Sequence, residues 1–382
     1  MAEQPMVIDD DDRYSRLRLI AWWDQEKLAS AHVMVVGAGA LGNEVLKNLA
    51  LMGIGQITIV DFDTVENSNL SRSVLFRASD RGKSKAEVAA AMVTELNSDC
   101  RVSPRHANVI TDIGLRLFRE VDVVIGCLDN REARLWVNRS CWKTSTPWID
   151  GGIQEINGVI KTFVPPHSAC YECGMTENDY RLINLRYSCP LLRQEDIMAG
   201  KVPTAPTISS IIGGMQVQEA LKLIHDLDVR AGCACVFNGV TNQFYQTEFQ
   251  RREDCLSHET IESIVDAPLS CHNRLDELFE FGLSHVGSPI QLRLDRDLVL
   301  DVHCGPCDQR RPVMRARQGV SVQDAACPDC GETGKPRIVH ALDQGSEFLN
   351  EQLVRLGIPD GDIVQLEGPQ GTVHVQLNAI PN

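Results

Sequence analysis

The chain has 382 residues, and 43% of them are hydrophobic, so it can bury one large core and a second, smaller one. It contains no run of roughly 18 consecutive apolar residues, and we therefore expect no membrane-spanning helix. The formal net charge of −15 argues against nucleic-acid binding. Residues 1–12 read as a disordered acidic start without a secretory signal, and we expect a cytoplasmic protein.

Strand-like and helix-like apolar patterns alternate between residues 13 and 262. Short β-branched runs are typical of buried parallel strands, whereas apolar residues three or four positions apart indicate amphipathic helices. The expected strands are 32–36, 56–60, 122–126 and a run entered at 147–149, and the expected helices are 41–51, 88–96 and 132–142. This alternation predicts a doubly wound α/β sheet.

The pattern changes after residue 150. We expect a strand at 159–164, then a long polar crossover loop at 174–203, then a helix at 209–227 and two strands within 234–249. Residues 263–382 are predicted to form a small second domain of α+β type. Its expected elements are a helix at 275–284, a strand at 292–302, a helix at 347–356 and a hairpin over 362–377.

A glycine-rich turn joins the first strand to the first helix. Gly37, Gly39 and Gly42 allow a tight turn and bring backbone N–H groups at a helix N-terminus close to phosphate oxygens. Asp61 follows the next strand, 19 residues after Gly42, where a carboxylate can bind ribose hydroxyls. On its own, this pattern fits a nicotinamide dehydrogenase as well as an ATP-dependent enzyme.

Polar residues beyond the second strand favour ATP. Asn69 and Arg72 follow that strand closely, and Lys85 opens the next helix. A dinucleotide has only a diphosphate, which the glycine loop already binds, so additional cations suit a triphosphate whose pyrophosphate must leave. Asp129 follows strand 122–126 at the carboxyl edge of the sheet, where a carboxylate can hold magnesium.

Together these motifs resemble those of the ThiF/MoeB/ubiquitin-activating-enzyme superfamily, and the resemblance covers residues 13–258. It implies a Rossmann-like adenylation domain in which Asp61 binds the ribose and Asp129 coordinates magnesium. The residues implied to grip the ATP phosphates are Asn69, Arg72 and Lys85. Arg16 lies in a segment similar to the superfamily's N-terminal element, from which an arginine reaches an ATP phosphate, often across a dimer interface. By analogy we expect a homodimer.

Cys170 and Cys173 form a Cys-x-x-Cys knuckle, which in an intracellular protein is typical of metal binding. Alignment with the superfamily puts its second knuckle on Cys255 and His258, and a Cys₃His set is an ordinary tetrahedral zinc site. Two alternatives remain open. Either no metal binds, or the set is completed by one of two other cysteines, Cys233 or Cys235.

A second group of cysteines lies in the C-terminal part of the chain. Two knuckles separated by 19 residues are typical of a zinc ribbon. The four cysteines are Cys304, Cys307, Cys327 and Cys330. Because the second domain has little apolar material, we expect zinc to stabilise its fold.

Cys189 is the candidate covalent nucleophile. It lies in the long polar stretch, where Pro190 disfavours helix and nearby arginines favour the thiolate. By resemblance, this segment is where ubiquitin-activating relatives carry the cysteine that accepts the activated protein as a thioester. The alternative is an incidental loop thiol.

The sequence therefore predicts an enzyme that uses ATP to adenylate the C-terminal glycine of a ubiquitin-like protein. A thioester on Cys189 and transfer to a conjugating enzyme would follow, and the groups that serve adenylation are Arg16, Arg72 and Asp129. A sulfur-carrier adenylyltransferase that forms no ubiquitin-type thioester is the alternative. A non-catalytic nucleotide-binding scaffold or a dehydrogenase is a third possibility, but neither explains why every phosphate-binding cation is present.

Overall fold

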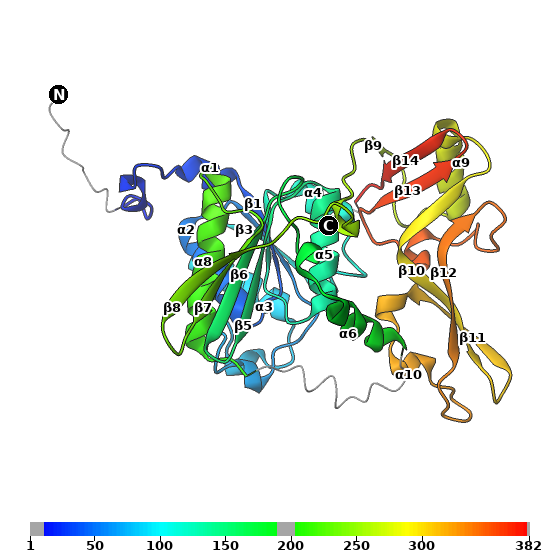
Figure 1. Ribbon diagram of the computed structural model, residues 1–382, viewed down its shortest axis with the longest axis horizontal. Coiled ribbons are helices and arrows are strands. Elements are labelled where there is room, and N and C mark those ends of the chain that lie inside the picture. Colours follow the sequence, from blue (N-terminus) through cyan, green and yellow to red (C-terminus); the bar gives the residue numbers. More distant parts are fainter. Residues whose placement is uncertain (1–10, 189–202, 380–382) are drawn as a thin grey trace.

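The computed structural model describes residues 11–188 and 203–379 and contains two β-sheets (Figure 1). The larger sheet has the strand order β3-β2-β1-β4-β5-β6-β7-β8, parallel from β3 to β5 and antiparallel from β5 onwards. Its strands are β1 His32–Val36, β2 Gln56–Val60, β3 Arg101–Arg105, β4 Val123–Gly126, β5 Trp148–Gln154, β6 Asn157–Phe163, β7 Cys233–Asn238 and β8 Gln243–Glu248. The α-helices in this part of the chain are α1 Gln25–Ser30, α2 Ala40–Met52, α3 Lys85–Leu96, α4 Leu115–Glu120, α5 Arg131–Lys143, α6 Glu177–Ser188 and α8 Pro206–Ile224.

Alternate residues of the central strand β1 face two separate cores. Val33 and Val35 pack in a core formed with α2, α3 and α8, whereas Met34 and Val36 pack in a core formed with α4 and α5. All four side chains are almost completely buried. Helices therefore cover both faces of the sheet, which explains the uninterrupted apolar run of β1.

The predicted parallel sheet is present, and β1, β2, β4, α2 and α5 agree with their predicted bounds to within one residue. Helix α3 begins at Lys85, which was expected to open it, and the Ser84 side chain caps the helix by accepting from the N–H of Glu87 (3.4 Å). Strand β3 was not predicted because it is an edge strand without a buried residue. The strand order reverses between β1 and β4, and ligands commonly bind at the carboxyl ends of strands at such a point.

Two predictions about the remaining elements were wrong. The expected crossover loop 174–203 contains helix α6, whose first turn is anchored by an ion pair from Arg131 to Asp179 (2.8 Å). The expected helix 347–356 is only a short 3-10 turn, Leu353–Leu356. Its backbone bonds to the segment around α9 instead: Leu275 donates to the carbonyl oxygen of Glu351 (3.0 Å). In both places tertiary contacts outweigh the local pattern.

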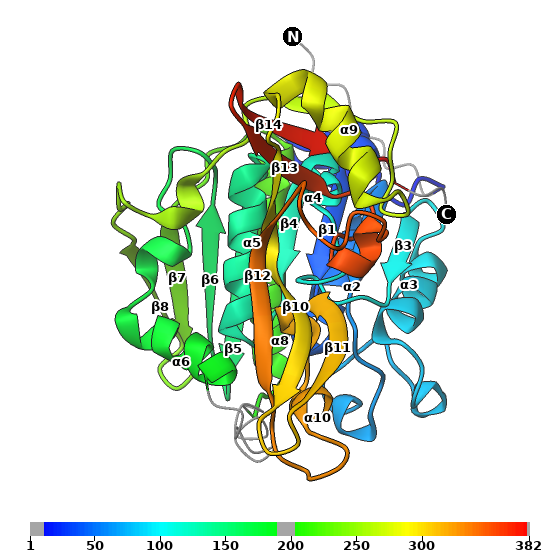
Figure 2. The same ribbon diagram turned by 90° about the vertical axis from the view of Figure 1, so that its right-hand side faces the viewer.

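The second sheet belongs to residues 264–379, which we call the second unit. Its strand order is β11-β10-β13-β14-β9, with β12 also paired to β10, and it has a core of its own. Its elements are β9 Ile264–Asp266, α9 Leu275–Val286, β10 Gln291–Cys304, β11 Gln309–Ala316, α10 Val322–Ala325, β12 Lys335–Asp343, β13 Ile363–Gly368 and β14 Gly371–Gln376. The unit lies beside α4 and α5 of the larger sheet (Figures 1 and 2). Among the described residues, no helix has both the length and the apolar composition needed to cross a bilayer.

Candidate functional site

The glycine loop between β1 and α2 touches the loop that follows β4. Gly37 has a φ of 98°, and its N–H donates to the carbonyl oxygen of Val60 (2.8 Å). A Cβ at Gly37 would collide with the carbonyl oxygen of Cys127, and a Cβ at Gly42 would collide with that of Gly37. Among the described residues, a Cβ at Gly39 would meet no atom within 4 Å. Gly37 and Gly42 therefore close the turn, while Gly39 borders open space at the N-terminus of α2, where phosphate can bind.

Asp61 orders the backbone next to this loop. Its two carboxylate oxygens accept from the N–H of Ala38 (2.7 Å) and of Asp63 (2.7 Å). Burial raises the pKa of Asp61, and the ammonium group of Lys85 opposes that rise. Lys85 is buried and donates to the Asp63 carboxylate (2.7 Å). The structure thus brings the predicted ribose carboxylate and phosphate-binding lysine together beside the glycine loop.

The segment with Asn69 and Arg72 is tied to the start of α3. The N–H of Val65 donates to the carbonyl oxygen of Lys83 (2.9 Å), which holds the segment near Lys85. Asn69 accepts from the N–H of Glu66 through its side-chain oxygen (2.9 Å) and so stabilises the short 3-10 turn Asn67–Asn69. The half-buried Arg72 donates to the carbonyl oxygen of Ser68 (3.3 Å). The predicted phosphate-binding residues therefore share one region.

Asp129 is exposed in the loop between β4 and α5. The next residue, Asn130, caps α5 by accepting from the N–H of Ala133 (2.8 Å), and it also donates to the Asp129 carboxylate (3.2 Å). This loop follows Cys127, whose carbonyl oxygen contacts the glycine loop. Asp129 therefore lies at the carboxyl edge of the sheet, where an exposed carboxylate suits magnesium.

Arg134 supports the Asp129 loop, and the sequence interpretation missed it. Its guanidinium donates to the carbonyl oxygens of Leu128 and Gly151 (3.1 Å for Gly151) and to the Asp150 carboxylate (2.8 Å). Asp150 is 1% exposed and also accepts from Lys161 (3.0 Å). Burial lowers the pKa of Arg134, but the Asp150 carboxylate outweighs it and raises that pKa above its usual value. The charged Asp150, which directly follows the apolar run 147–149, was the sequence signal that a buried ion pair lies here.

Arg16 lies at the other edge of the sheet. Two residues earlier, the ring of Tyr14 packs against Gly53 at the C-terminal end of α2, and Asn97 donates to the Tyr14 hydroxyl (2.7 Å). Helix α2 has 13 residues, which corresponds to about 20 Å. The glycine loop begins this helix and the Tyr14 contact ends it. The structure therefore does not bring Arg16 to the glycine loop of its own chain.

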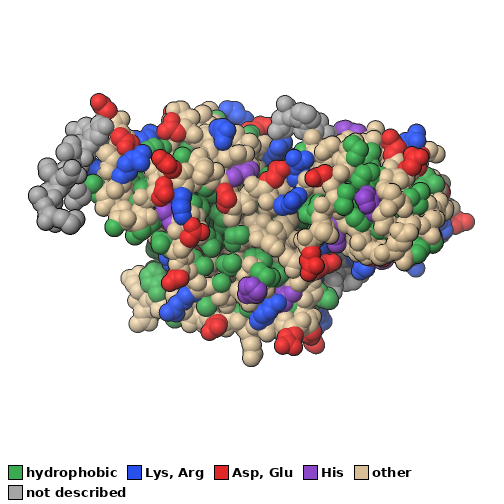
Figure 3. All heavy atoms as spheres, turned by 90° about the horizontal axis from the view of Figure 1, so that it is seen from above, with side chains coloured by type: hydrophobic (Ala, Val, Ile, Leu, Met, Phe, Trp, Pro, Cys, Tyr) green, Lys and Arg blue, Asp and Glu red, His purple; other side chains and the backbone are tan. Residues whose placement is uncertain are grey.

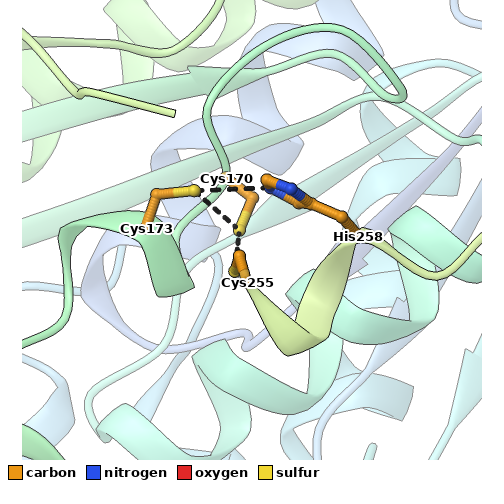
Figure 4. Close-up of side chains that lie close together, drawn as sticks. All are labelled: Cys170, Cys173, Cys255 and His258. Carbon is orange, nitrogen blue, oxygen red and sulfur yellow. Dashed lines mark hydrogen bonds between the residues drawn. The ribbon is translucent and has the colours of Figure 1, made fainter. Parts of the chain in front are cut away.

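The first predicted metal cluster is assembled (Figure 4). The Cys170 sulfur lies 3.7 Å from that of Cys173 and 3.5 Å from that of Cys255, and His258 Nε2 lies 3.3 Å from the Cys173 sulfur. These separations suit tetrahedral zinc with Zn–S bonds of about 2.3 Å. Burial and the neighbouring Arg251 lower the pKa of His258, which favours the neutral imidazole that binds metals.

The four atoms come from distant parts of the chain, and Glu172 joins these parts. Glu172 lies between the two cysteines of the first knuckle, and its fully buried carboxylate accepts from Ser257, which lies between Cys255 and His258. It also accepts from Arg139 of α5 (2.7 Å) and from Tyr180 of α6 (2.8 Å). Glu172 was not predicted, although a charged residue inside a knuckle was a visible signal.

The second predicted cluster is assembled at the end of the strand pair β10–β11. The ligand atoms lie within 4.8 Å of one another, with 3.5 Å between the sulfurs of Cys304 and Cys330 and 3.9 Å between those of Cys307 and Cys327. Backbone N–H groups of Cys330 and Asp329 lower the pKa of Cys327 to about 7. Four converging sulfurs, one of them readily ionised, are a suitable donor set for zinc.

The other cysteines do not join these clusters. Cys233 and Cys235 lie on β7 and are absent from both sets of ligands found among the described residues, so the alternative that either completes the first cluster loses support. Cys141 is completely buried, and burial raises its pKa well above the usual value, as expected for a core thiol. Cys189, the predicted nucleophile, lies outside the described residues.

A doubly wound sheet with a glycine loop, a carboxylate after the second strand and a buried lysine beside it is typical of nucleotide-binding α/β proteins. The ThiF family model matches residues 12–257, which is more than half of the sequence. The chain therefore belongs to the ThiF family.

Individual relatives cover this region in different ways. The NEDD8-activating enzyme E1 catalytic subunit of Dictyostelium discoideum is 41% identical over 156 residues, 37% of this chain and 35% of that protein. The adenylyltransferase and sulfurtransferase MOCS3 of Drosophila virilis is 30% identical over 281 residues, 70% of this chain and 59% of that protein. This chain thus spans between about a third and three fifths of these two relatives. The solved structure of MccB from E. coli with AMPCPP and MccA is 26% identical with a TM-score of 0.55, and the match covers 66% of this chain and 76% of that one.

Proposed function

We propose that this protein is an ATP-dependent enzyme that adenylates the C-terminal glycine of a ubiquitin-like protein. The observation that carries the proposal is the meeting of the glycine loop, Asp61 and Lys85 at the carboxyl edge of a ThiF-family sheet. The reaction requires ATP and magnesium. After adenylation, the Cys189 thiolate attacks the acyl carbon and AMP leaves, which forms a thioester. A thiol of a conjugating enzyme then takes the acyl group and releases Cys189.

The chemistry of adenylation depends on placement and charge. An oxygen of the glycine carboxylate attacks the α-phosphorus of ATP, the bond from that phosphorus to the bridging oxygen breaks, and pyrophosphate leaves. The carboxylate is already ionised at neutral pH, so no general base is needed. Lys85, Arg72 and the N–H groups at the start of α2 stabilise the charge on the leaving phosphates. Asp129 would hold the magnesium ion, which adds positive charge to the phosphates when bound.

Exposed apolar side chains around the edge strand β8 support a protein substrate. Ile156 lies in the turn between β5 and β6, Val240 follows β7, and Phe244 and Tyr245 lie on β8, at the same edge of the sheet as the glycine loop. All four are exposed, with 76% of Val240 accessible. Strand β8 is also a sheet edge with no buried residue, and such edges and apolar patches favour protein partners. We propose that the globular part of the ubiquitin-like protein docks here and extends its C-terminal tail toward the glycine loop.

The position of Arg16 supports a homodimer. Because Arg16 lies away from the glycine loop of its own chain, we propose that it acts at the site of a second copy. The neighbouring side chains Leu19, Ile20 and Trp22 are exposed, as an interface requires. Figure 3 views the molecule from the side of α1 and shows hydrophobic side chains at the surface among charged ones.

We also propose one zinc ion at each cysteine cluster. The Cys₃His set joins the knuckle before α6 to the segment that follows β8. The Cys₄ set joins the ends of β10 and β11 to the segment before β12, and thereby makes the small C-terminal domain a zinc ribbon. Structural zinc of this kind contributes directly to folding.

A sulfur-carrier adenylyltransferase is the second candidate function. It is favoured by the greater extent of the MOCS3 match, which covers 70% of this chain against 37% for the NEDD8-activating subunit. Such an enzyme stops at the adenylate or a persulfide, so the two functions differ in whether a protein thioester forms.

The decisive experiment is exchange of labelled pyrophosphate into ATP. The probe is a ubiquitin-like protein that ends in glycine, and its control carries one additional residue after that glycine. Exchange with the probe and none with the control is the expected result. Exchange without any partner, or hydride transfer to a nicotinamide cofactor, would contradict the proposal.

A further inference from the structure

Among the contacts between the second unit and the rest of the described chain is a buried arginine, Arg296. Arg296 on β10 is only 4% exposed. Its guanidinium donates to the carbonyl oxygens of Ile110 and Ile113 (2.8 Å for Ile113) and pairs with Asp362 (2.7 Å). It also lies 4.4 Å from the ring centroid of Trp136 on α5. A buried arginine with so many partners specifies one geometry for the groups around it.

Asp362 makes a second link at the start of α4. Its other carboxylate oxygen accepts from the N–H of Leu115 (2.9 Å), and the N–H of Arg116 donates to the carbonyl oxygen of Gly361 (3.1 Å). A Cβ at Gly114 would be too close to the backbone around Gly361 (2.5 Å). The second unit therefore caps α4 from outside, because its acceptors satisfy N–H groups that the first turn of a helix leaves open.

The segment held in this way is bonded to the backbone of Asp61, the proposed ribose-binding residue. The N–H of Asp61 donates to the carbonyl oxygen of Arg105 (3.1 Å), and the N–H of Ala107 donates to that of Asp61 (3.3 Å). A ring nitrogen of His106 lies 2.8 Å from the carbonyl oxygen of Phe62. The carbonyl group of Ile110, which Arg296 holds, follows only three positions after Ala107.

We propose that Arg296 is a positioning residue for ATP binding, through which the second unit holds residues 106–113 beside Asp61. The proposal rests on the ATP function proposed above and assigns the second unit a part in it. Without Arg296, the two carbonyl groups lose their donor and the segment gains conformational freedom. ATP binding must then order the segment, and the loss of conformational entropy makes the free energy of ATP binding less favourable.

The test replaces both members of the buried ion pair, so that neither charge is left buried without its partner. In Arg296→Met combined with Asp362→Asn, residue 362 keeps an acceptor for the N–H of Leu115. We expect the dissociation constant for ATP, measured by titration calorimetry, to rise about tenfold. The KM for the ubiquitin-like probe should stay within about twofold, because β3, which leads into residues 106–113, and the proposed docking strand β8 are opposite edges of the sheet. The matched control is Arg293→Met on the same strand, whose exposed ion pair with Glu367 (3.4 Å) should leave ATP binding unchanged.

The outcomes separate this proposal from the proposed function. A folded double variant that binds ATP as tightly as wild type would overturn the role of Arg296. Wild-type protein that binds no ATP would overturn the proposed function instead. Hydrogen exchange on the wild type gives a test that does not depend on a variant folding. ATP should slow exchange at residues 106–116 and at 361–364 of the second unit, and protection that ends at residue 107 would overturn the proposal.

Discussion

At the scale of single residues, substitutions of two glycines in the same loop should affect different properties. One should reduce stability, and the other should weaken ATP binding. Gly42→Ala introduces a Cβ that collides with the carbonyl oxygen of Gly37, so we expect a stability loss of about 1–3 kcal/mol. Gly39→Ala should unfold at the wild-type temperature, because its Cβ meets no described atom within 4 Å. It should nevertheless bind ATP at least about tenfold more weakly, because the methyl group occupies the space beside the N-terminus of α2 in which the phosphates are expected to bind. Thermal unfolding and ATP titration check both variants, and tight ATP binding by Gly39→Ala would mean that the phosphates bind elsewhere.

Substitution of Arg72 or Asp129 at the carboxyl edge of the sheet should reduce catalysis and leave the protein folded. Arg72→Ala or Asp129→Ala should lower ATP–pyrophosphate exchange by at least about 10²-fold, which is typical when a charge-stabilising group is removed. Lys83→Ala is the control, because Lys83 is an exposed cation of the same region that pairs with Asp80 (3.0 Å). Exchange that persists in both test variants would contradict the assigned site.

Cys189→Ala should separate adenylation from thioester formation. Adenylation uses no thiol, so pyrophosphate exchange should remain close to wild type. The thioester should disappear, because transfer to a thiolate splits one difficult acyl transfer into two easier ones and needs that nucleophile. The measurement is gel electrophoresis without reductant after incubation with ATP, magnesium and the ubiquitin-like probe.

The cysteine controls then identify the nucleophile. A thiol-sensitive adduct that persists in Cys189→Ala would move the role to Cys233 or Cys235, whose pKa values burial raises. If wild type forms no adduct, the sulfur-carrier function gains support.

At the scale of elements, the two cysteine clusters predict separable zinc sites. Wild-type protein purified without chelator should contain about two zinc ions per chain. Cys170→Ser and Cys304→Ser should each reduce the content to about one, because three ligands hold zinc more weakly than four. Cys233→Ser should retain both ions, since it belongs to neither cluster. Elemental analysis gives the count, and wild-type protein without zinc would contradict both sites.

Helices and strands also differ in how well the local apolar pattern of the sequence predicts them. β1, α2 and β2 were predicted because buried strands and amphipathic helices have distinct apolar periods. Helix α6 was missed because Asp179 and Tyr180 bind groups outside the helix, on Arg131 and Glu172. Local periodicity carries no information about such partners.

At the scale of the whole molecule, the distance between Arg16 and the glycine loop predicts a site shared between two copies. In a symmetric dimer, the Arg16→Ala chain keeps its own Arg72 and receives Arg16 from an Arg72→Ala partner. Co-expression of these two inactive variants should therefore restore about a quarter of wild-type exchange, because half of the dimers are mixed and each has one intact site. Exchange assays on the co-purified mixture give the measurement. No restoration in a mixture that contains mixed dimers would contradict the role of Arg16 in the partner's site.

The sequence by itself determined the parallel sheet, the glycine loop and the four cysteines of the second cluster, but it left the partners of Cys170 and Cys173 open. These depend on apolar period, on residues adjacent in the chain and on the strong preference of metal sites for Cys-x-x-Cys spacing. Only the tertiary structure decided that His258 joins Cys173, that Arg16 lies away from the glycine loop, and that Arg296 holds the segment beside Asp61. Arg296 and Ile110 are 186 positions apart, and nothing local to either residue specifies the other. Such contacts arise only when separately folded layers pack and each buried polar group must find a partner.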